Sequence, residues 1–547
     1  MFKALAIIPP VEKDPNANGK LSDDEAVIDK AKKEYNKLKS RFNLGRIIPN
    51  VILPALVGAA VWARQPSDNQ FTAPPAALRK CLDSVCAGAD NCVRYPASGE
   101  NREYFQWASP FNLGRIVLPA AVVRPSTDEQ VSGFVQCAAD SNVKVQARSG
   151  GHSYANYGAG GYNGSLSVDL INYRYVTLNE TTWLTTIGGG SLLGDIDDLL
   201  DNQKGNRAFP HGVCPGVGIG GHATIGGLGP SSRMWGATLD HVVEAKVVTA
   251  NGTIVTASEA KYPDLFFAIR GAAAGFGIVT QFVIKTVEKP KKTLHFTHRT
   301  PYTNSEGIVE QFKRWREMVA DKKLDHRIGT EFALDPEGSK ITATWFGTRQ
   351  DFDQSGIAER LGLKLTPVES SWVNTKRWQY ENAVLTLSDI PTEFFSRSLG
   401  FTADDATSFN ATERLVQLIA ANRSQSKLKW FCIFDATGGK VAEPAMDSTA
   451  YAHRDKVMFY QSYLYNIWAP LTADEKGLLN GIHETIVGGI PTRSPSTYPG
   501  YIDPLLENPQ EAYWGPNLDR LEAIKREWDP EDVFHNPQSV RPAKLKL

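Results

Sequence analysis

His152 and Cys214 are the two residues of this chain whose type and setting most clearly suggest chemistry. His152 lies in the stretch R-S-G-G-H-S-Y-A-N-Y-G, and Cys214 lies in G-V-C-P-G-V-G-I-G-G-H-A-T-I-G-G-L-G. Glycine has no Cβ and tolerates positive φ, so such loops let backbone N–H groups close around a flat or phosphorylated ligand while one side chain reaches its reactive atoms. The two loops together suggest a covalently held cofactor.

Simpler interpretations of these loops compete with that hypothesis. Gly216 to Gly221 formally match the dinucleotide fingerprint G-x-G-x-x-G, but the apolar strand that such a site needs does not precede them. His211, Cys214 and His222 are zinc-ligand types, yet no carboxylate or second cysteine stands at a familiar spacing, so we expect no metal. Taken singly, Cys214 could be a buried thiol and His152 a hydrogen-bonded loop residue.

Alternating strand and helix patterns must position the two loops. Residues 116–125 predict a buried strand, residues 127–140 a helix that begins with a capping box, and residues 143–148 a second strand that ends at the His152 loop. Asn251-Gly252 predicts the turn of a hairpin. After about residue 290 the glycine density falls, which indicates a second domain.

Length and composition limit the class of protein. A chain of 547 residues exceeds what one hydrophobic core usually serves, so we expect two packed domains and an N-terminal extension. Apolar residues make up 42% of the chain, and 46 glycines and 32 prolines favour a mixed α and β fold with many turns. The net charge of −1, without a basic stripe, argues against a nucleic-acid partner and favours a neutral small molecule.

Cysteines and glycosylation triplets favour an oxidising compartment. Cys81, Cys86 and Cys92 lie within twelve residues, a clustering that suits disulfides. Asn-x-Ser/Thr triplets occur at Asn163, Asn179, Asn251, Asn410 and Asn422. We therefore expect a secreted glycoprotein.

The N-terminal 63 residues contain an unusual targeting pattern. Residues 23–39 predict an amphipathic helix, acidic first and basic last. The apolar run 47–63 follows a basic patch and ends in small residues, which resembles a signal peptide displaced inward. This run contains Pro49 and Pro54 and is shorter than the ~20 apolar residues of a spanning helix. We interpret it as a secretion signal behind a misplaced start codon, with a membrane anchor or a surface-docked arm as alternatives.

The chain resembles the secreted flavin oxidases of the berberine-bridge-enzyme-like family, and most closely glucooligosaccharide and chitooligosaccharide oxidases. The resemblance covers about residues 81–542 and rests on motifs in the same order: G-G-H-S-Y, C-P-x-V-G-x-G-G-H, D-L-F-F-A-I-R-G-A-A-A-G-F-G-I-V, T-A-Y-A-H-R-D and D-P-E-D-V-F. It implies an α+β fold of the vanillyl-alcohol-oxidase type. A two-part FAD-binding domain, 81–290 and 501–547, would enclose a substrate domain at 291–500, an antiparallel sheet covered by helices, behind an extension at 1–80.

The resemblance also implies FAD held by two covalent bonds, from His152 to the flavin 8α-methyl carbon and from Cys214 to flavin C6. Two tethers would fix the ring and make it a stronger oxidant. The loop from Arg148 to Ser153 would cradle the pyrophosphate. The remaining cofactor positions are Arg148, Ser149, Gly150, Gly151, Ser153, Gly218, Gly221, His222, Gly226, Gly277 and Ile278. Cys81 and Cys137 match a family disulfide, which leaves Cys86 and Cys92 as a possible further pair.

Hydride transfer from an alcohol to flavin N5 also requires a proton acceptor. Residues 496–503, S-T-Y-P-G-Y-I-D, align with the family's Y-x-N-Y-x-D, whose second tyrosine is the catalytic base, here Tyr501. Asp435 matches the carboxylate that assists it. A free phenol has a pKa of about 10 and therefore needs assistance to act as a base at neutral pH. We expect Asp435 to orient the phenol of Tyr501 and relay its proton. Tyr154 is expected to line the substrate pocket. A core position for Tyr501 is the simpler alternative.

Departures from the family motif flank the expected base. Gly500 replaces an asparagine, and Ala436-Thr437 stand where the compared sugar oxidases carry Phe-His. We expect a secreted, monomeric oxidase that converts the C1 hydroxyl of an oligosaccharide to a lactone while O2 becomes H2O2. One alternative is FAD-linked oxidation or cyclisation of a secondary metabolite. Another is a non-catalytic carbohydrate-binding protein that contains flavin.

Overall fold

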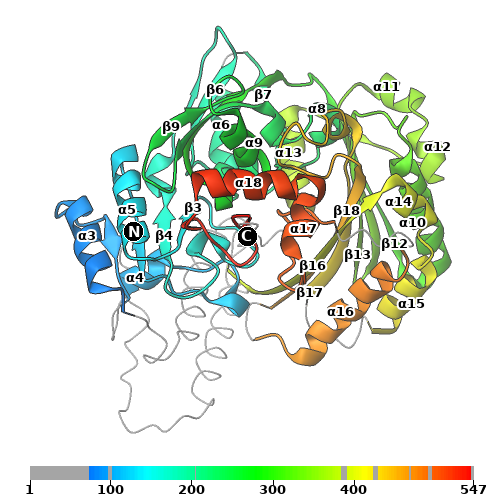
Figure 1. Ribbon diagram of the computed structural model, residues 1–547. Coiled ribbons are helices and arrows are strands. Elements are labelled where there is room, and N and C mark those ends of the chain that lie inside the picture. The colour runs from blue at the N-terminus through cyan, green and yellow to red at the C-terminus, as the bar shows by residue number, and fades with distance from the viewer. Residues whose placement is uncertain are drawn as a thin grey trace, which may run out of the picture. The chain divides into compact units, whose positions relative to one another are not determined.

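The computed structural model describes residues 73–96, 102–203, 205–383, 391–422, 429–466, 470–490 and 496–543. The helix predicted over 23–39 and the apolar run 47–63 lie outside these ranges. Within them, helices alternate with strands that form both parallel and antiparallel pairs (Figure 1). The α+β class expected from the sequence is confirmed.

A small, largely parallel sheet leads into the His152 loop. Its strand order is β1 (Val93–Arg94), β2 (Ala121–Val123), β4 (Leu166–Asp169), β3 (Val145–Arg148), and only β1 runs antiparallel to its neighbour. β2 is shorter than the strand predicted over 116–125. Because β3 ends at Arg148, the chain enters the glycine-rich loop directly from a buried strand.

Helix α5 (Asp128–Asp140) connects β2 to β3, and its start differs in one detail from the prediction. The Thr127 hydroxyl accepts the Gln130 N–H at 3.3 Å, as an N-cap does. The Gln130 side chain, however, accepts from the Ser126 N–H at 2.7 Å rather than from Thr127. The prediction of a reciprocal capping box is therefore wrong, because the side-chain amide of Gln130 bonds one residue before the N-cap.

A five-stranded antiparallel sheet follows. Its order is β5 (Val176–Leu178), β6 (Leu184–Gly188), β10 (Ile278–Lys285), β8 (Val242–Val248), β9 (Ile254–Ala257). The hairpin predicted at Asn251-Gly252 is confirmed: the Gly252 N–H donates to the Thr249 carbonyl at 2.9 Å, and Gly252 has φ +79°. A two-stranded ribbon pairs β7 (Arg207–Ala208) with β11 (Val287–Glu288).

The second half of the chain forms a seven-stranded antiparallel sheet. Its order is β15 (Val368–Ser370), β12 (Thr293–Pro301), β14 (Gly338–Trp345), β13 (Ile328–Asp335), β17 (Lys429–Ala436), β18 (Lys456–Asn466), β16 (Glu393–Thr402). Figure 1 shows α10, α14, α15 and α16 on one face of it. These helices span Ser305–Ala320, Ala403–Ser408, Thr412–Asn422 and Ala473–Val487.

Strand periodicity divides the residues of this sheet between two faces. On β17, Cys432 and Phe434 belong to the core shared with α10 and α15, whereas Ile433 and Asp435 point to the opposite face. The opposite face therefore carries the polar residues that are available to a ligand.

The remaining helices connect these sheets or cover them. They are α3 (Ala76–Cys86), α4 (Arg102–Trp107), α6 (Leu193–Asn202), α7 (Ile219–Ile225), α8 (Ser232–Trp235), α9 (Pro263–Ala272), α11 (Arg349–Gln354), α12 (Ile357–Leu361), α13 (Trp372–Asn382), α17 (Pro509–Trp514) and α18 (Leu518–Trp528).

The C-terminal segment returns to the first half of the chain. Leu521 and Ile524 of α18 share a core with Phe266 of α9 and Phe282 of β10. The indole of Trp514 donates to the Gly271 carbonyl at 3.0 Å. This packing accords with a two-part domain, whose boundaries at 290 and 501 stay a prediction.

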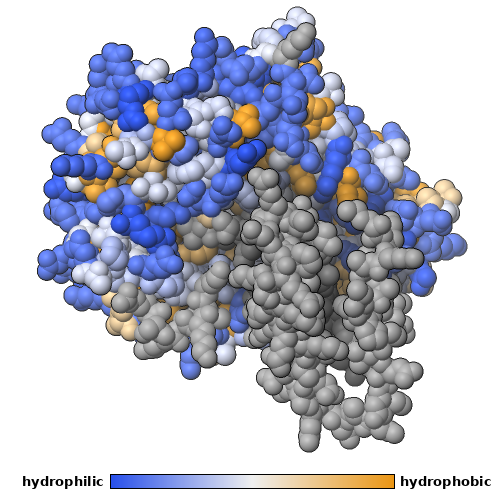
Figure 2. Space-filling model, turned by 180° about the vertical axis from the view of Figure 1, so that it is seen from behind, coloured by the Kyte–Doolittle hydropathy of each residue, from blue (hydrophilic) through white to orange (hydrophobic). Residues whose placement is uncertain are grey.

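Two disulfides lie near the start of the described chain. Cys81 is bonded to Cys137, which ties α3 to α5, and Cys86 is bonded to Cys92. Among the described residues, no helix combines the length and the apolar character that crossing a membrane requires. On the face in Figure 2, the described surface is mostly hydrophilic, and apolar side chains occur in small separate spots.

Candidate active site

A cavity of about 460 Å³ is bordered by both glycine-rich loops and by the open face of the seven-stranded sheet. From the loops it receives the expected residues Arg148, Ser149, Gly150, Gly151, His152, Ser153, Tyr154, Cys214, Gly218, Gly221 and His222. From the sheet and the segment after it come Asp435 and Tyr501, and Gly277 lies in the wall as well. Residues from distant parts of the sequence thus meet in one space.

Close backbone contact between the loops requires glycine at two positions. A Cβ on Gly150 would lie 2.4 Å from the Gly218 nitrogen, and a Cβ on Gly218 would lie 2.1 Å from the Gly150 nitrogen. The Ser149 hydroxyl fastens the contact, because it donates to the Gly189 carbonyl at 2.7 Å and accepts the Gly220 N–H at 3.3 Å. The glycines therefore bring together the two loops that carry His152 and Cys214.

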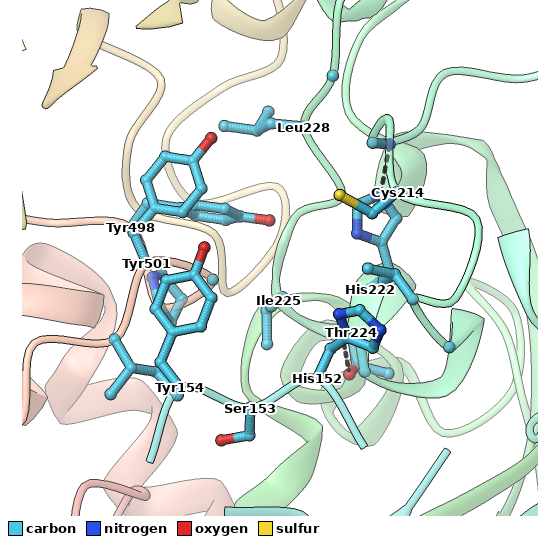
Figure 3. Close-up of a pocket in the computed structure, with 18 of the residues that line it drawn as sticks. His152, Ser153, Tyr154, Cys214, His222, Thr224, Ile225, Leu228, Tyr498 and Tyr501 are labelled. Atoms are coloured by element: carbon cyan, nitrogen blue, oxygen red, sulfur yellow. Dashed lines mark hydrogen bonds between the residues drawn. The ribbon is translucent and has the colours of Figure 1, made fainter. Parts of the chain in front are cut away.

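His152 and Cys214 face the same side of the cavity (Figure 3). The imidazole of His152 stacks on the ring of Phe111, with centroids 4.8 Å apart. Cys214 is half-buried in the loop before α7 and lies outside both disulfides. The other cysteine outside the disulfides, Cys432, is buried in the helix-covered core, and burial raises the pKa of its thiol. Only Cys214 of these two can reach a ligand in the cavity.

His222 lies beside Cys214, on α7 (Figure 3). Its Nε2 accepts the Gly212 N–H at 3.0 Å, so the proton of the neutral ring resides on Nδ1. Burial lowers the pKa of His222 to about 3, and nearby His211 and Lys376 act in the same direction. His222 is therefore a neutral hydrogen-bond donor at physiological pH.

Tyr154, Tyr498 and Tyr501 form the opposite side of the cavity from His152 and Cys214 (Figure 3). The Tyr501 hydroxyl donates to Oδ2 of Asp435 at 2.9 Å, and the Gln461 amide donates to the same oxygen at 2.7 Å. Burial raises the pKa of Asp435 to about 6, against the lowering effect of these two hydrogen bonds. Burial, and then the charge of Asp435, raises the pKa of Tyr501 well above its usual value. Tyr501 is therefore protonated at rest.

Tyr154 is linked to the same network. Its hydroxyl contacts that of Tyr463, and both hydroxyls contact Oε1 of Gln461. The Tyr154 ring packs edge-on against Phe394, with centroids 4.9 Å apart. The residue expected to line the pocket thus also supports the partner of Asp435.

Two predicted cofactor positions do not lie in the cavity wall. Gly226 lies behind it, against the ring of Tyr498, and has φ +145°. Ile278 is fully buried at the start of β10, one residue past Gly277, in the core beneath the small parallel sheet. Both remain predictions that the cavity lining does not support.

Sequence reasoning missed several residues of the wall, above all Phe111, Glu331, Phe394, Gln461 and Tyr498. Gln461 lies between the buried aromatic residues Phe459 and Tyr463 on one face of β18, so its polarity is the available signal. Glu331 on β13 shows the same kind of interruption. His211, by contrast, is turned to Asp197, at 2.9 Å from its Nε2.

Two protein-family models match parts of this chain. The family model described as "FAD binding domain" matches residues 119–258, and "Berberine and berberine like" matches residues 497–541. FAD-linked oxidoreductase sorD of Penicillium rubens is 34% identical over 474 residues, which cover 85% of this chain and 98% of that protein.

Solved structures of oligosaccharide oxidases have a similar fold. The xylooligosaccharide oxidase from Myceliophthora thermophila, in complex with xylobiose, superposes with a TM-score of 0.77 at 32% identity over 86% of this chain and 100% of its own. The glucooligosaccharide oxidase from Acremonium strictum, whose FAD is described as 6-S-cysteinyl and 8α-N1-histidyl, gives a TM-score of 0.74 at 30% identity over 85% and 99%. The chain therefore belongs to the berberine-bridge-enzyme-like family and is an FAD-linked oxidoreductase.

Proposed function

We propose that this enzyme is an oxidase that carries FAD on both His152 and Cys214 and removes a hydride from an alcohol carbon, with O2 reduced to H2O2. The two side chains enter one cavity from the two glycine-dense loops. The Acremonium relative with a similar fold carries a cysteinyl and histidyl FAD. These observations support double attachment.

The residues present fit a flavin. A cavity bordered by His152 and Cys214 on one side and by phenols on the other suits a flat ring. Backbone N–H groups of glycine-rich loops are also the donors that a pyrophosphate needs. His222, held neutral with a proton on Nδ1, can donate a hydrogen bond into this space.

The hydrogen bond from Tyr501 to Asp435 carries the proposal. Bound FAD supplies an acceptor for the hydride, and the protein must take up the hydroxyl proton. Tyr501 accepts that proton as its own passes to Asp435 over the 2.9 Å contact. Gln461 holds the carboxylate in place through its 2.7 Å hydrogen bond.

For the substrate we infer an oligosaccharide oxidised at C1 to a lactone. Relatives similar to this chain are named xylooligosaccharide, glucooligosaccharide and chitooligosaccharide oxidases. One observation favours a second candidate, a secondary metabolite: the cavity wall beside Asp435 is made by the small side chains of Ala436 and Thr437. This leaves room for a ring system bulkier than a sugar.

Anaerobic mixing tests the function. Xylobiose, cellobiose and chitobiose are each added to purified holoenzyme, and loss of the oxidised-flavin absorbance is followed by stopped flow. We expect at least one to bleach the flavin, and air to restore the colour with one H2O2 per turnover. Bleaching by phenolic or polyketide alcohols alone would select the second candidate. No bleaching by any compound would favour a non-catalytic, flavin-containing protein and overturn the proposal.

We further propose that the enzyme is secreted and monomeric. Two disulfides support an oxidising compartment. Expression of the full chain in a secreting fungal host, followed by N-terminal sequencing and light scattering of the medium fraction, tests both points. Protein found only inside the cells would contradict secretion.

A further inference from the structure

Glu331 lies directly across the sheet from Asp435. β13 and β17 are antiparallel, and their register pairs Glu331 with Asp435 and Phe332 with Phe434. Side chains of directly opposed residues point to the same face, with Cβ atoms about 4.5–5.5 Å apart. Both carboxyl groups line the cavity, whereas Phe332 and Phe434 are buried among the helices. The sheet therefore holds two carboxyl groups side by side under the cavity.

Hydrogen-bond donors are distributed unequally over the two groups. Oδ2 of Asp435 accepts from both Tyr501 and Gln461. Oε1 of Glu331 is buried and has no hydrogen-bond partner within the described part of the chain. Hydrogen bonds stabilise the ionised form, and burial favours the neutral form. For Glu331, the raising effect of burial and of the Asp435 charge on the pKa exceeds the lowering effect of Lys340 and of the Thr342 hydroxyl. The negative charge therefore belongs on Asp435 and the proton on Glu331.

No ion pair offsets a double charge. Among the described residues, neither carboxylate takes part in a salt bridge, although the charge of Lys340 lowers the pKa of Glu331. The groups that face the pair are Lys340 on β14, whose ammonium donates to the Asn382 carbonyl at 2.7 Å, and the phenols of Tyr154, Tyr463 and Tyr501. Two adjacent buried carboxylates cannot both ionise easily, so one proton is retained.

We propose, on the basis of the proposed function, that Glu331 and Asp435 share one proton, with Glu331 as the protonated member, and that this pair sets the proton affinity of Asp435 toward Tyr501. Glu331 is thus a positioning residue that acts through Asp435. In turnover the substrate O–H proton goes to Tyr501, and the Tyr501 proton goes to Asp435. The pair then holds two protons. Reduction of O2 to H2O2 takes two electrons and two protons, and the proton stored on the pair can supply one of them.

The titration order supports this assignment. Burial raises the pKa of Asp435 to about 6. Burial, and then the charge on Asp435, raises the pKa of Glu331 to about 7. The two groups titrate as a pair: the first ionisation leaves a carboxylate that can accept the proton, and the second adds a charge that makes this carboxylate a stronger acceptor. The bleaching rate should therefore rise over both ionisations.

The test compares wild-type holoenzyme with Glu331→Gln. The control is Glu337→Gln, an exposed carboxylate at the far end of the same hairpin. Limiting rates of anaerobic bleaching are measured from about pH 5 to 9. We expect Glu331→Gln to abolish the upper ionisation and keep the lower one, with a loss of about three- to tenfold above neutral pH. Glu331→Asp, which restores a carboxyl group, should recover the upper step, and E337Q should match wild type.

Infrared spectroscopy of the resting enzyme gives an independent readout. A protonated carboxylic acid band should be present near neutral pH in wild type and E337Q and absent in E331Q. If E331Q keeps both the band and the upper ionisation, the proposal is wrong. If it weakens only substrate binding and leaves the pH profile unchanged, Glu331 is a substrate contact, and the proposal is also wrong. Failure of wild type to bleach would instead refute the proposed function, because the infrared titration needs no substrate.

Discussion

The phenol of Tyr501 donates a hydrogen bond to Oδ2 of Asp435 over 2.9 Å, although 66 positions separate the two residues in the chain. Both residues line the cavity, and Tyr501 faces His152 and Cys214 across it (Figure 3). In the proposed reaction, this contact joins the acceptor of the substrate hydroxyl proton to the carboxylate that takes the phenolic proton. Replacement of either residue should therefore slow flavin bleaching.

Replacing Tyr501 by Phe should slow anaerobic flavin bleaching by about 10²- to 10⁴-fold, because the variant lacks the proton acceptor. Covalent flavin content should stay unchanged. Tyr175→Phe is the matched control: Tyr175 is exposed, its hydroxyl donates to Gln281, and neither residue lines the cavity. A wild-type rate in the Tyr501 variant would show that another group accepts the proton.

Replacing Asp435 by Asn should change the pH dependence of bleaching. In wild type the carboxylate form of Asp435 is lost as pH falls through about 6, so the rate should fall with it. The Asn variant has no such group and should be slower by about ten- to a hundredfold above that pH, with no inflection there. Stopped-flow rates across buffers of constant ionic strength would check this. An inflection that persists near the same pH would assign it to a different residue.

Single and double removal of the two tethers should be distinguishable by acid precipitation. His152→Ala and Cys214→Ala should each leave a yellow pellet, held by the remaining bond, whereas the double variant should release its flavin to the supernatant. Each single variant should also have a lower midpoint potential, because one electron-withdrawing bond is lost. Cys432→Ala, a buried thiol outside the cavity wall, serves as the control and should keep both bonds by peptide mapping.

The two disulfides should differ in their effect on stability. The Cys81–Cys137 bond closes a separation of 56 residues and the Cys86–Cys92 bond one of 6. Loop-closure entropy then predicts that loss of the long-range bond lowers the free energy of unfolding by about 2 kcal/mol more than loss of the short one. Urea unfolding of the two paired Cys→Ala variants measures the difference. Equal losses would mean that the unfolded chain is already constrained in this region.

Arg454, in the T-A-Y-A-H-R-D motif, makes a buried two-point ion pair with Asp240. The guanidinium nitrogens lie 2.9 and 2.7 Å from the two carboxylate oxygens, and the Arg454 side chain is 3% exposed. Asp240→Asn should destabilise the protein by about 3–5 kcal/mol, because a buried cation loses its counter-ion. Asp264→Asn, which breaks the exposed pair with Arg520, should change stability by less than about 1 kcal/mol. Similar effects of both would contradict a structural role for the motif.

Much of the flavin side of the site could be predicted from local sequence. Glycine density around His152 and Cys214 marks backbone that approaches its neighbours closely, as the contact of Gly150 with Gly218 shows, although Ile219–Ile225 of the second motif form helix α7. The hairpin at Asn251-Gly252 and helix α5 also follow from short-range preferences. The C-terminal segment containing Tyr501 is identified by motif order, because no periodicity distinguishes it.

The substrate side of the site was decided by tertiary structure. Glu331, Asp435 and Gln461 lie on three different strands, and each interrupts a run that is mostly buried. Which of these polar residues become neighbours depends on strand order and register, and a shift by one residue would turn every side chain to the other face. The sequence by itself determined where the reactive loops lie, because loop conformation is a local property. Only the folded sheet brought two carboxyl groups together at the cavity, because pairing between distant strands is not encoded in either strand alone.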